Sequence, residues 1–128
     1  MRNSLAADNC PAARALDVIG ERWSLLIVRE ALGGARRFDD FRGRLPISDN
    51  TLARRLAELV DRQVLDRQPY QTEPARFDYV LTDRGKSLVS VLASLAEWGD
   101  RWTDPDPAGP TPPSVPAWLP ATEVARGA

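Results

Sequence analysis

The stretch FDDFRGRLPISDNTLARRLAELVDRQVLDR, residues 38–67, contains the local signals that decide the fold. A short helix is expected over Phe38–Arg44, and it runs into the turn Leu45-Pro46-Ile47. Ser48 offers a hydroxyl N-cap for a second helix, which can extend to about Arg62. The sequence therefore predicts two helices joined by a tight turn, the helix-turn-helix motif.

The second helix has two chemically different sides when its residues are placed at about 100° intervals. One side is expected in the core and contains Leu52, Leu56, Leu59 and Val60. The first two turns of the other side contain Asn50, Thr51, Arg54 and Arg55. Arginine can bridge guanine O6 and N7, asparagine can pair with adenine, and threonine can touch a thymine methyl or a phosphate. Because recognition helices read bases mainly through their N-terminal residues, this pattern favours a DNA-reading helix over a merely solvated one.

Length and composition favour one domain followed by a tail. The chain has 128 residues, of which 43% are hydrophobic, enough for a single core. Its beginning, MRNSLAADNC, lacks the apolar stretch of a signal peptide, and no apolar run approaches ~18 residues. The single cysteine cannot form an internal disulfide, which agrees with a reducing compartment. We therefore expect a cytoplasmic protein without membrane contact.

No catalytic or metal-binding constellation can be assembled from these residues. The chain has no histidine, one cysteine and no carboxylate cluster at ligand spacing, so neither a metal site nor a cofactor is expected. The same absences exclude Ser-His-Asp and Cys-His catalysis, and no glycine-rich phosphate loop is present. We expect that the protein is not an enzyme.

The net charge of −1 argues mildly against nucleic acid, since most such binders carry a basic excess. Its distribution is more informative, because residues 36–67 contain eight arginines against six acidic residues. Basic charge is thus concentrated, although weakly, at the predicted helix-turn-helix. We expect modest non-specific DNA affinity with a shallow dependence on salt.

Two short runs of β-type residues follow the second helix, at 64–70 and 76–81, with a turn-like loop at 71–75. A β-hairpin directly after a recognition helix makes a winged helix. Wings commonly reach phosphates or the minor groove, and Arg76 is the only basic residue at this tip. A solvated hairpin charge is an equally good interpretation of Arg76.

Helices are also expected on both sides of this motif. Pro11 is suited to the first position of a helix that ends at Gly20, and Glu21 begins a second that Gly33-Gly34 stop. The second is nearly all apolar in its middle and should be the central core helix. Trp23 within it is expected in the core or at an interface.

Thr82 caps a last long helix, predicted from Asp83 to about Trp102. Its apolar positions cover more than one narrow stripe: Leu88, Val91, Leu92, Leu95, Ala96, Trp98 and Trp102. A helix with so much apolar surface at the end of a small domain usually buries part of it against another chain. A homodimer is therefore expected, as an operator with two half-sites also requires.

Several motifs occur in a specific order: Cys10-Pro11, LDVIGERW at 16–23, Arg37-Phe38, Ile47-Ser48, Leu52, Leu56, Leu59, FDYVLTDRG at 77–85 and Glu97-Trp98-Gly99. Over residues 10 to about 102 the chain resembles the HxlR-type branch of the MarR-like winged-helix transcription regulators of bacteria. The resemblance implies a mainly helical fold with a small β-hairpin wing, dimerising through its first and last helices. It also implies recognition helices in successive major grooves, repression rather than activation and, in some members, a response to oxidants through the cysteine at the position of Cys10.

The chain departs from the family pattern at two places. Gln63 stands where the family usually has glycine before the first wing strand, so the recognition helix is expected to end less sharply. The wing also has less positive charge than many relatives, which lowers its expected contribution to DNA affinity.

Cys10 is a candidate redox sensor. It precedes Pro11 at a helix N-terminus, where the dipole and free N–H groups favour a thiolate. Its oxidation could give a sulfenic acid, a mixed disulfide with a small thiol, or a Cys10–Cys10 bridge between subunits. The alternative is a buried, unreactive cap residue in the dimer interface. A different switch would be a small aromatic or apolar effector, with Trp23 and Trp98 among the walls of its pocket.

The sequence divides into a flexible N-terminus at 1–9, the winged-helix domain at 10–102 and a proline-rich tail at 103–128. The tail holds seven of the eleven prolines and is expected to be extended or disordered. Its segment PAWLP, 116–120, is either a docking motif or a segment whose Trp118 folds back over its own domain.

The sequence thus predicts a dimeric, sequence-specific DNA-binding transcription regulator, a repressor released from its operator by an effector or by oxidation. The predicted DNA contacts are Ser48, Asp49, Asn50, Thr51, Arg54, Arg55, Arg37 and Arg76. The alternative is a winged-helix module for protein–protein contact without specific DNA binding. The near-neutral charge supports that alternative, and the polar cluster at the start of the recognition helix opposes it.

Overall fold

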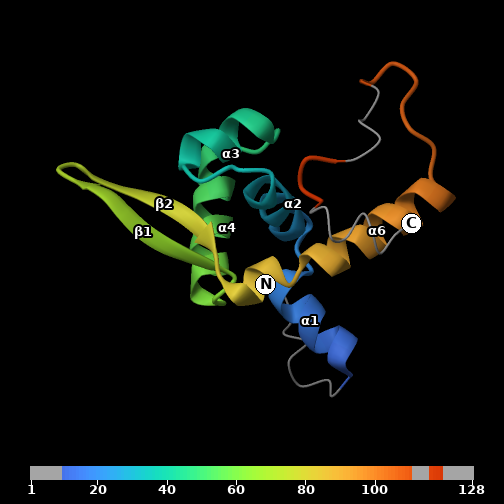
Figure 1. Ribbon diagram of the computed structural model, residues 1–128, viewed down its shortest axis with the longest axis horizontal. Coiled ribbons are helices and arrows are strands. Elements are labelled where there is room, and N and C mark those ends of the chain that lie inside the picture. Colours follow the sequence, from blue (N-terminus) through green and yellow to red (C-terminus); the bar gives the residue numbers. More distant parts are fainter. Residues whose placement is uncertain (1–9, 111–115, 120–128) are drawn as a thin grey trace.

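The computed structural model describes residues 10–110 and 116–119. Within them the elements are α1 (Pro11–Ile19), α2 (Arg22–Leu32), α3 (Phe38–Arg44), α4 (Asp49–Asp61), β1 (Leu65–Thr72), β2 (Ala75–Leu81), α5 (Asp83–Lys86) and α6 (Val89–Trp102) (Figure 1). The two strands form an antiparallel hairpin. The expected mainly helical fold with one small wing is confirmed, and the predicted N-terminal segment 1–9 lies outside the described residues.

Short-range sequence signals set most of the helix boundaries. Pro11 is the first residue of α1, and the Glu21 carboxylate caps α2 by accepting a hydrogen bond from the backbone N–H of Trp23 at 2.8 Å. At the start of α4 the Ser48 hydroxyl accepts from the N–H of Thr51 at 3.3 Å. Each contact satisfies a helical N–H that has no partner within the helix. The predicted limits of these helices are confirmed.

The core is built around α2, as predicted. Ile27 and Val28 at the middle of this helix are fully buried. Residues from α3, α4, the link before β1, β1 itself and α6 complete the core: Phe41, Leu52, Leu56, Leu59, Val64, Leu65 and Leu92. Because the apolar side of α4 is fixed in this core, its opposite side faces solvent in one defined orientation.

Helix α4, the predicted recognition helix, ends sharply, so the expectation of a less sharp end is wrong. The N–H of Val64 bonds to the carbonyl of Leu59, and the N–H of Gln63 bonds to the carbonyl of Val60. These two bonds make a Schellman motif, and Val64 and Leu59 both belong to the core, as that motif favours. Gln63 adopts the left-handed conformation, with φ 64°, that glycine usually supplies here. A complete cap therefore forms without the glycine.

The single long helix predicted over Asp83–Trp102 is also wrong, because the chain breaks between α5 and α6. At the break the N–H of Leu88 bonds to the carbonyl of Gly85, three residues back, rather than four. The Ser87 hydroxyl donates to the carbonyl of Arg84 at 2.6 Å, a contact that bends helices. The break gives α6 a direction of its own, away from the wing (Figure 1).

The wing and the terminal helices lie at opposite ends of the molecule. In Figure 1 the hairpin projects to one side of the helices, whereas α1 and α6 project on the other. No helix in the ranges 10–110 and 116–119 is long and apolar enough to cross a membrane.

The tail has neither helix nor strand in its described parts, 103–110 and 116–119, beyond the end of α6. Trp118 is half-buried and packs against the hydrophobic core. Of the two interpretations of this tryptophan, the structure therefore supports the one in which it folds back over its own domain.

Candidate nucleic-acid interface

The start of α4 presents the side chains expected to read bases. Asn50 and Arg54 are exposed, and Thr51 is half-buried beside them. No hydrogen bond or ion pair joins the side chain of Asn50 or Arg54 to another residue that the structure describes. Both are therefore available to a ligand without an internal interaction being broken. Ser48, by contrast, is occupied as the helix cap and lies 2.9 Å from the Thr51 hydroxyl.

Arg55 lies differently from Arg54, although the sequence placed both on the DNA-facing side. Its Nε lies 3.3 Å from the Glu21 carboxylate, and its Nη1 donates to Glu58 at 2.8 Å. Only 18% of its side chain is exposed. The guanidinium thus links α4 to the beginning of α2, and a base contact by Arg55 would require these ion pairs to break.

The acidic residue at the start of α4, Asp49, is also paired. Its carboxylate lies 3.3 Å from Arg42 of α3, and the same guanidinium reaches Asp39 at 2.9 Å. Asp49 also lies in the first turn of α4, where a negative charge interacts favourably with the helix dipole. These contacts partly compensate an anionic charge that would otherwise repel phosphate.

An open cleft of about 510 Å³ separates the wing from the start of α3. Arg37 and Arg76 both line it, together with the aromatic side chains of Phe38, Tyr70, Phe77 and Tyr79. Arg76 is exposed near the hairpin tip, and its side chain makes no ion pair with any residue in the described ranges. The guanidinium of Arg37 stacks 3.8 Å from the centre of the Tyr70 ring. The predicted Arg37 and Arg76 are thereby brought to one cleft beside α3.

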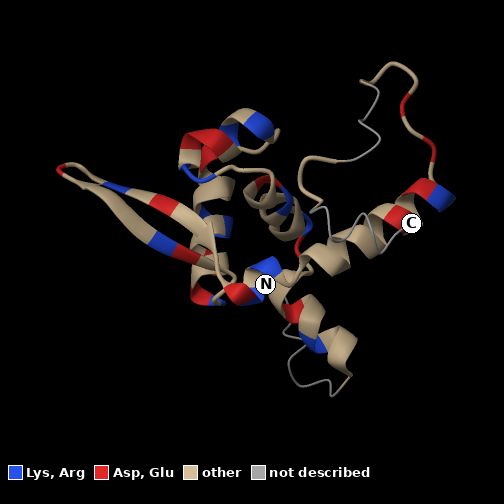
Figure 2. Ribbon diagram, viewed as in Figure 1, with Lys and Arg blue, Asp and Glu red and all other residues tan. Residues whose placement is uncertain are grey.

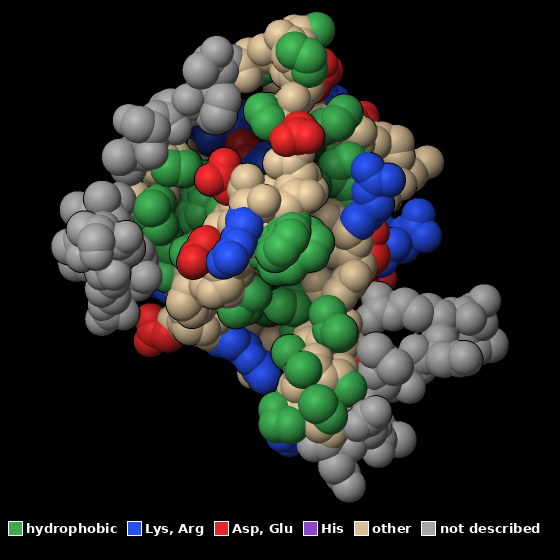
Figure 3. All heavy atoms as spheres, turned by 90° about the vertical axis from the view of Figure 1, so that its right-hand side faces the viewer, with side chains coloured by type: hydrophobic (Ala, Val, Ile, Leu, Met, Phe, Trp, Pro, Cys, Tyr) green, Lys and Arg blue, Asp and Glu red, His purple; other side chains and the backbone are tan. Residues whose placement is uncertain are grey.

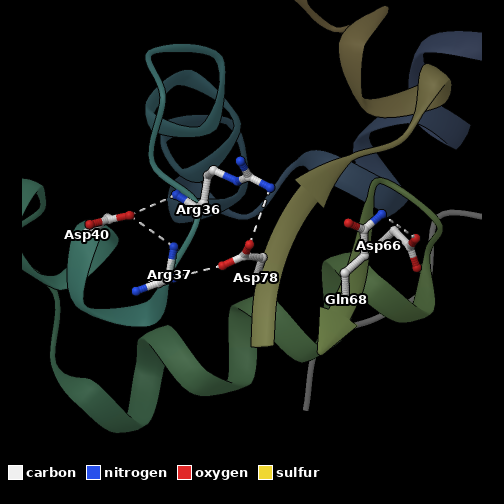
Figure 4. Close-up of polar contacts among 6 residues, drawn as sticks. All are labelled: Arg36, Arg37, Asp40, Asp66, Gln68 and Asp78. Carbon is white, nitrogen blue, oxygen red and sulfur yellow. Dashed lines mark hydrogen bonds and ion pairs between the residues drawn. The ribbon is translucent and has the colours of Figure 1, made fainter. Parts of the chain in front are cut away.

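The wing is fastened to the loop before α3 by a cluster of four charged residues (Figure 4). Asp78 of β2 lies 3.3 Å from both Arg36 and Arg37. The backbone N–H groups of the same two arginines donate to the Asp40 carboxylate at 3.0 Å. In addition, the N–H of Tyr79 donates to the carbonyl of Arg36 at 2.6 Å. The hairpin is therefore held at a fixed angle to the helix-turn-helix.

The roles of Asp78, Arg36 and Asp40 in this cluster were not predicted from the sequence. The local signal for Asp40 was its place three residues after the N-cap Arg37, where a carboxylate can cap free N–H groups. The contact with Asp78 joins residues about 40 positions apart, which no local pattern specifies. The two backbone bonds from Arg36 and Arg37 lower the pKa of the Asp40 carboxyl below its ordinary value.

Charges of both signs are interleaved over this surface. Figure 2 shows basic and acidic residues next to one another on α3, on α4 and along the wing, with an acidic residue at the hairpin tip. Further along the hairpin, Asp66 accepts a hydrogen bond from Gln68 at 3.4 Å. Such a surface attracts DNA less strongly over distance than a uniformly basic one, and its specificity depends on individual contacts.

The other candidate residues lie away from α4. Cys10 is exposed at the N-cap of α1, where hydrogen bonds from the backbone N–H groups of Ala13 and Ala12 lower the pKa of its thiol. Trp23 is half-buried against the core and has Arg22 above its ring. Trp98 is 63% exposed on α6. In the part of the chain that the structure describes, no group of three or more His, Cys, Asp or Glu residues could hold a metal ion.

Comparisons with known proteins agree with this geometry. A family model described as HxlR-like helix-turn-helix matches residues 18–107. The HTH-type transcriptional regulator Rv3095 of Mycobacterium tuberculosis is 45% identical over 97 residues, which are 76% of this chain and 61% of that protein. The chain thus spans about three fifths of the length of this curated relative.

Two solved structures share the fold. PA1607 superimposes with a TM-score of 0.75 and 36% identity, covering 84% of this chain and 75% of that one. The redox regulator HypR in its reduced form gives a TM-score of 0.66 and 31% identity, covering 72% of this chain and 92% of that one. The helix-turn-helix, the wing and the family match together identify the protein: it belongs to the HxlR-like helix-turn-helix family.

Proposed function

We propose that this protein is a sequence-specific DNA-binding transcription regulator. The observation that carries the proposal is the start of α4, where the side chains of Asn50 and Arg54 are exposed and unpaired among the described residues. These residue types recognise adenine and guanine edges, and recognition helices use their first turns for that purpose. The relative Rv3095 is named an HTH-type transcriptional regulator, which supports the same function.

The predicted contact residues divide into three roles in this proposal. Asn50, Thr51 and Arg54 read base edges in the major groove. Arg37 and Arg76 contact phosphates on either side of the wing cleft, and Ser48 and Asp49 shape the start of the helix. Arg55 holds α4 against α2 through Glu21 rather than reading a base.

The regulator is proposed to act as a homodimer through α1 and α6. Hydrophobic side chains gather over these two helices on the face shown in Figure 3. The exposed apolar residues of this face are Leu16, Val91, Leu95, Trp98 and Trp102. Contiguous apolar patches of this kind mark protein interfaces. A two-fold dimer would place two α4 helices in half-sites about one helical turn apart.

Release from DNA is proposed to follow a change at Cys10 or the binding of an effector. Cys10 is exposed and its thiol pKa is lowered, so a larger fraction is the reactive thiolate at neutral pH. The structural neighbour HypR is a redox regulator solved in reduced and oxidized forms. Repression rather than activation, and the involvement of Trp23 and Trp98 in an effector pocket, stay predictions.

The alternative of a protein-contact module is less well supported. The relatives are named as transcription regulators. A protein contact would not require the side chains of Asn50 and Arg54 to be exposed and unpaired among the described residues. The near-neutral net charge is the argument in favour of a protein-contact module. A surface with interleaved charges (Figure 2) is equally compatible with DNA binding that depends on specific contacts more than on long-range attraction.

The experiment is a gel shift with the DNA flanking the coding region of this protein, in the presence of excess competitor DNA. Arg54→Ala is expected to lose about 1–3 kcal/mol of binding free energy and to relax sequence preference. Arg14→Ala is the matched control, because Arg14 is an exposed arginine outside the predicted contact set. It also lies about 200° around α1 from Leu16, the residue of that helix in the proposed dimer face. Absence of specific binding by the unchanged protein would put the protein-contact module first.

The same assay tests the thiol switch. Binding is measured before and after an oxidant, and again after a thiol reductant. A loss of binding that the reductant reverses and that Cys10→Ser abolishes supports Cys10 as the sensor. Specific binding that is indifferent to the oxidant removes Cys10 from the mechanism and leaves an effector as the switch.

A further inference from the structure

A crevice separate from the DNA-facing surface lies between α2 and β2, and we call it the α2–β2 crevice. It has a volume of about 530 Å³ and is formed by the end of α2, the loop that follows, the end of β2, and the junction of α5 and α6. Its wall is mainly apolar: Ala31, Leu32, Ala35, Tyr79, Val80, Leu81 and Val89. Its size falls within the range typical of small-molecule sites, which are apolar clefts with few polar groups.

The polar groups at this crevice have one sign of charge. Arg36 and Lys86 line it from opposite segments, the loop after α2 and the end of α5. Among the residues that the structure describes, no acidic residue lines it. Lys86 is exposed and makes no ion pair with any residue in the described ranges. An apolar wall with two cations is complementary to a ligand that has a hydrocarbon body and one carboxylate.

The crevice shares residues with the attachment of the wing. Arg36, one of its two cations, also holds Asp78 of β2 at 3.3 Å. Tyr79, part of its apolar wall, donates its backbone N–H to the carbonyl of Arg36. A carboxylate at Arg36 would compete with Asp78 for the guanidinium, so an occupied crevice would loosen the wing from the helix-turn-helix.

From this geometry we propose that the α2–β2 crevice binds an amphipathic monocarboxylate and that its occupation weakens DNA binding through Arg36 and Asp78. The second half of this proposal rests on the proposed DNA-binding function, whereas the first does not. The site is also distinct from a pocket walled by Trp23 and Trp98, since neither residue lines it.

Binding is tested without DNA, on the full chain, with octanoate as the probe and neutral octanamide as its matched control. In a ¹H–¹⁵N correlation spectrum, octanoate is expected to shift the amide signals of Gly34, Val80 and Lys86. Lys86→Gln should weaken octanoate binding about two- to fivefold, the scale of one exposed ion pair. Lys86→Arg should retain it, and Arg14→Gln, a charge removed far from the crevice, should leave it unchanged.

Three outcomes would overturn the site: no saturable binding, shifts centred on α1 and α6 instead, or equal affinity for octanamide and octanoate. Because DNA is absent from this titration, its result does not depend on whether the protein binds DNA. The regulatory half is then tested by gel shift, in which octanoate should weaken operator binding by the unchanged protein more than by Lys86→Gln. If octanoate binds in the crevice but does not change the affinity for the operator, only the regulatory half of the proposal is overturned.

Discussion

The guanidinium of Arg55 lies 3.3 Å from the carboxylate of Glu21, and this ion pair joins the recognition helix to the start of the central helix. Both side chains are largely buried, with 18% and 17% of their surfaces exposed. Glu21 also caps α2 through the N–H of Trp23. One carboxylate thus fixes both a helix end and the position of α4. Arg54, next to Arg55 in the sequence, is exposed and forms no ion pair with any described residue.

This arrangement predicts that replacing the two adjacent arginines of α4 has different effects on stability. Arg55→Ala should lower the free energy of unfolding by about 1–3 kcal/mol, because the largely buried Glu21 carboxylate loses its charged partner. Arg54→Ala should change stability by no more than about 0.5 kcal/mol, as expected of an exposed side chain. Urea unfolding followed by circular dichroism measures both. Equal stability of the two variants would show that the Arg55–Glu21 pair contributes nothing.

Gly85 is expected to tolerate no side chain. A Cβ at this position would lie 2.2 Å from the carbonyl oxygen of Val64, a backbone atom that cannot move aside independently. Gly85→Ala should therefore destabilise the fold by about 1–3 kcal/mol, the usual range for overpacking. Gly43→Ala on α3 is the control, since no atom of the described residues outside the local backbone lies within 4 Å of its Cβ position. That change should stabilise by about 0.5–1 kcal/mol through helix propensity. Thermal unfolding that ranks the two variants in the reverse order would contradict the packing argument.

Gln63 is a site where the family's usual glycine should improve stability. Its φ of 64° lies in the left-handed region, which costs residues with a Cβ about 1–2 kcal/mol. Glycine adopts this conformation readily but loses more chain entropy on folding, so Gln63→Gly should gain about 0.5–1 kcal/mol. Gln63→Ala keeps the unfavourable Cβ and should give little or no gain. We expect the urea midpoint to rise for Gln63→Gly but not for Gln63→Ala. An equal rise for both variants would mean that loss of the side-chain amide, and not relief of the left-handed backbone, stabilises the protein.

Asp40 should make the stability depend on pH in the acidic range. The pKa of Asp40 is lower in the folded protein than in the unfolded chain. The ionised carboxylate therefore contributes its full stabilisation above the ordinary carboxyl pKa of about 4. This contribution is lost as the pH falls through the lower folded-state pKa. Because the group is accessible to solvent, the contribution should stay below about 1 kcal/mol. Urea unfolding at pH 7 and at pH 3 measures the difference. Asp40→Asn should show a smaller loss of stability between these two pH values than the unchanged protein, whereas an identical loss would contradict the role of Asp40.

The proposed dimer is tested on the exposed face of α6. Trp98→Glu puts a charge into the centre of the apolar patch and should weaken association by about 2 kcal/mol or more, the scale of an interface hot spot. Glu97→Gln is the control, since residue 97 lies about 100° around the helix from residue 98. Sedimentation velocity should show dimers of the unchanged protein and of Glu97→Gln, but monomers of Trp98→Glu with an unchanged circular dichroism spectrum. A monomeric unchanged protein would exclude this interface.

The sequence by itself determined the class of fold and most of the helix boundaries, although not the break between α5 and α6. Pro11, Glu21, Ser48 and the glycines at 33–34 act within a few residues of their own position, so their effect on the backbone can be predicted locally. The leucine period of the recognition helix likewise identified its buried side, because a helical repeat fixes which residues share a face. The candidate base-reading residues Asn50 and Arg54 followed from the same period.

Tertiary structure alone decided which charges are available and how the parts are joined. Helical spacing places Arg54 and Arg55 on one polar surface, but the ion pair with the distant Glu21 is formed by Arg55 and not by Arg54. The attachment of the wing by Arg36, Arg37 and Asp78 likewise joins residues about 40 positions apart. The break between α5 and α6 accompanies the close approach of the Gly85 backbone to Val64. In each case the partner is distant in sequence, so the contact exists only once packing of the core has brought the two segments together.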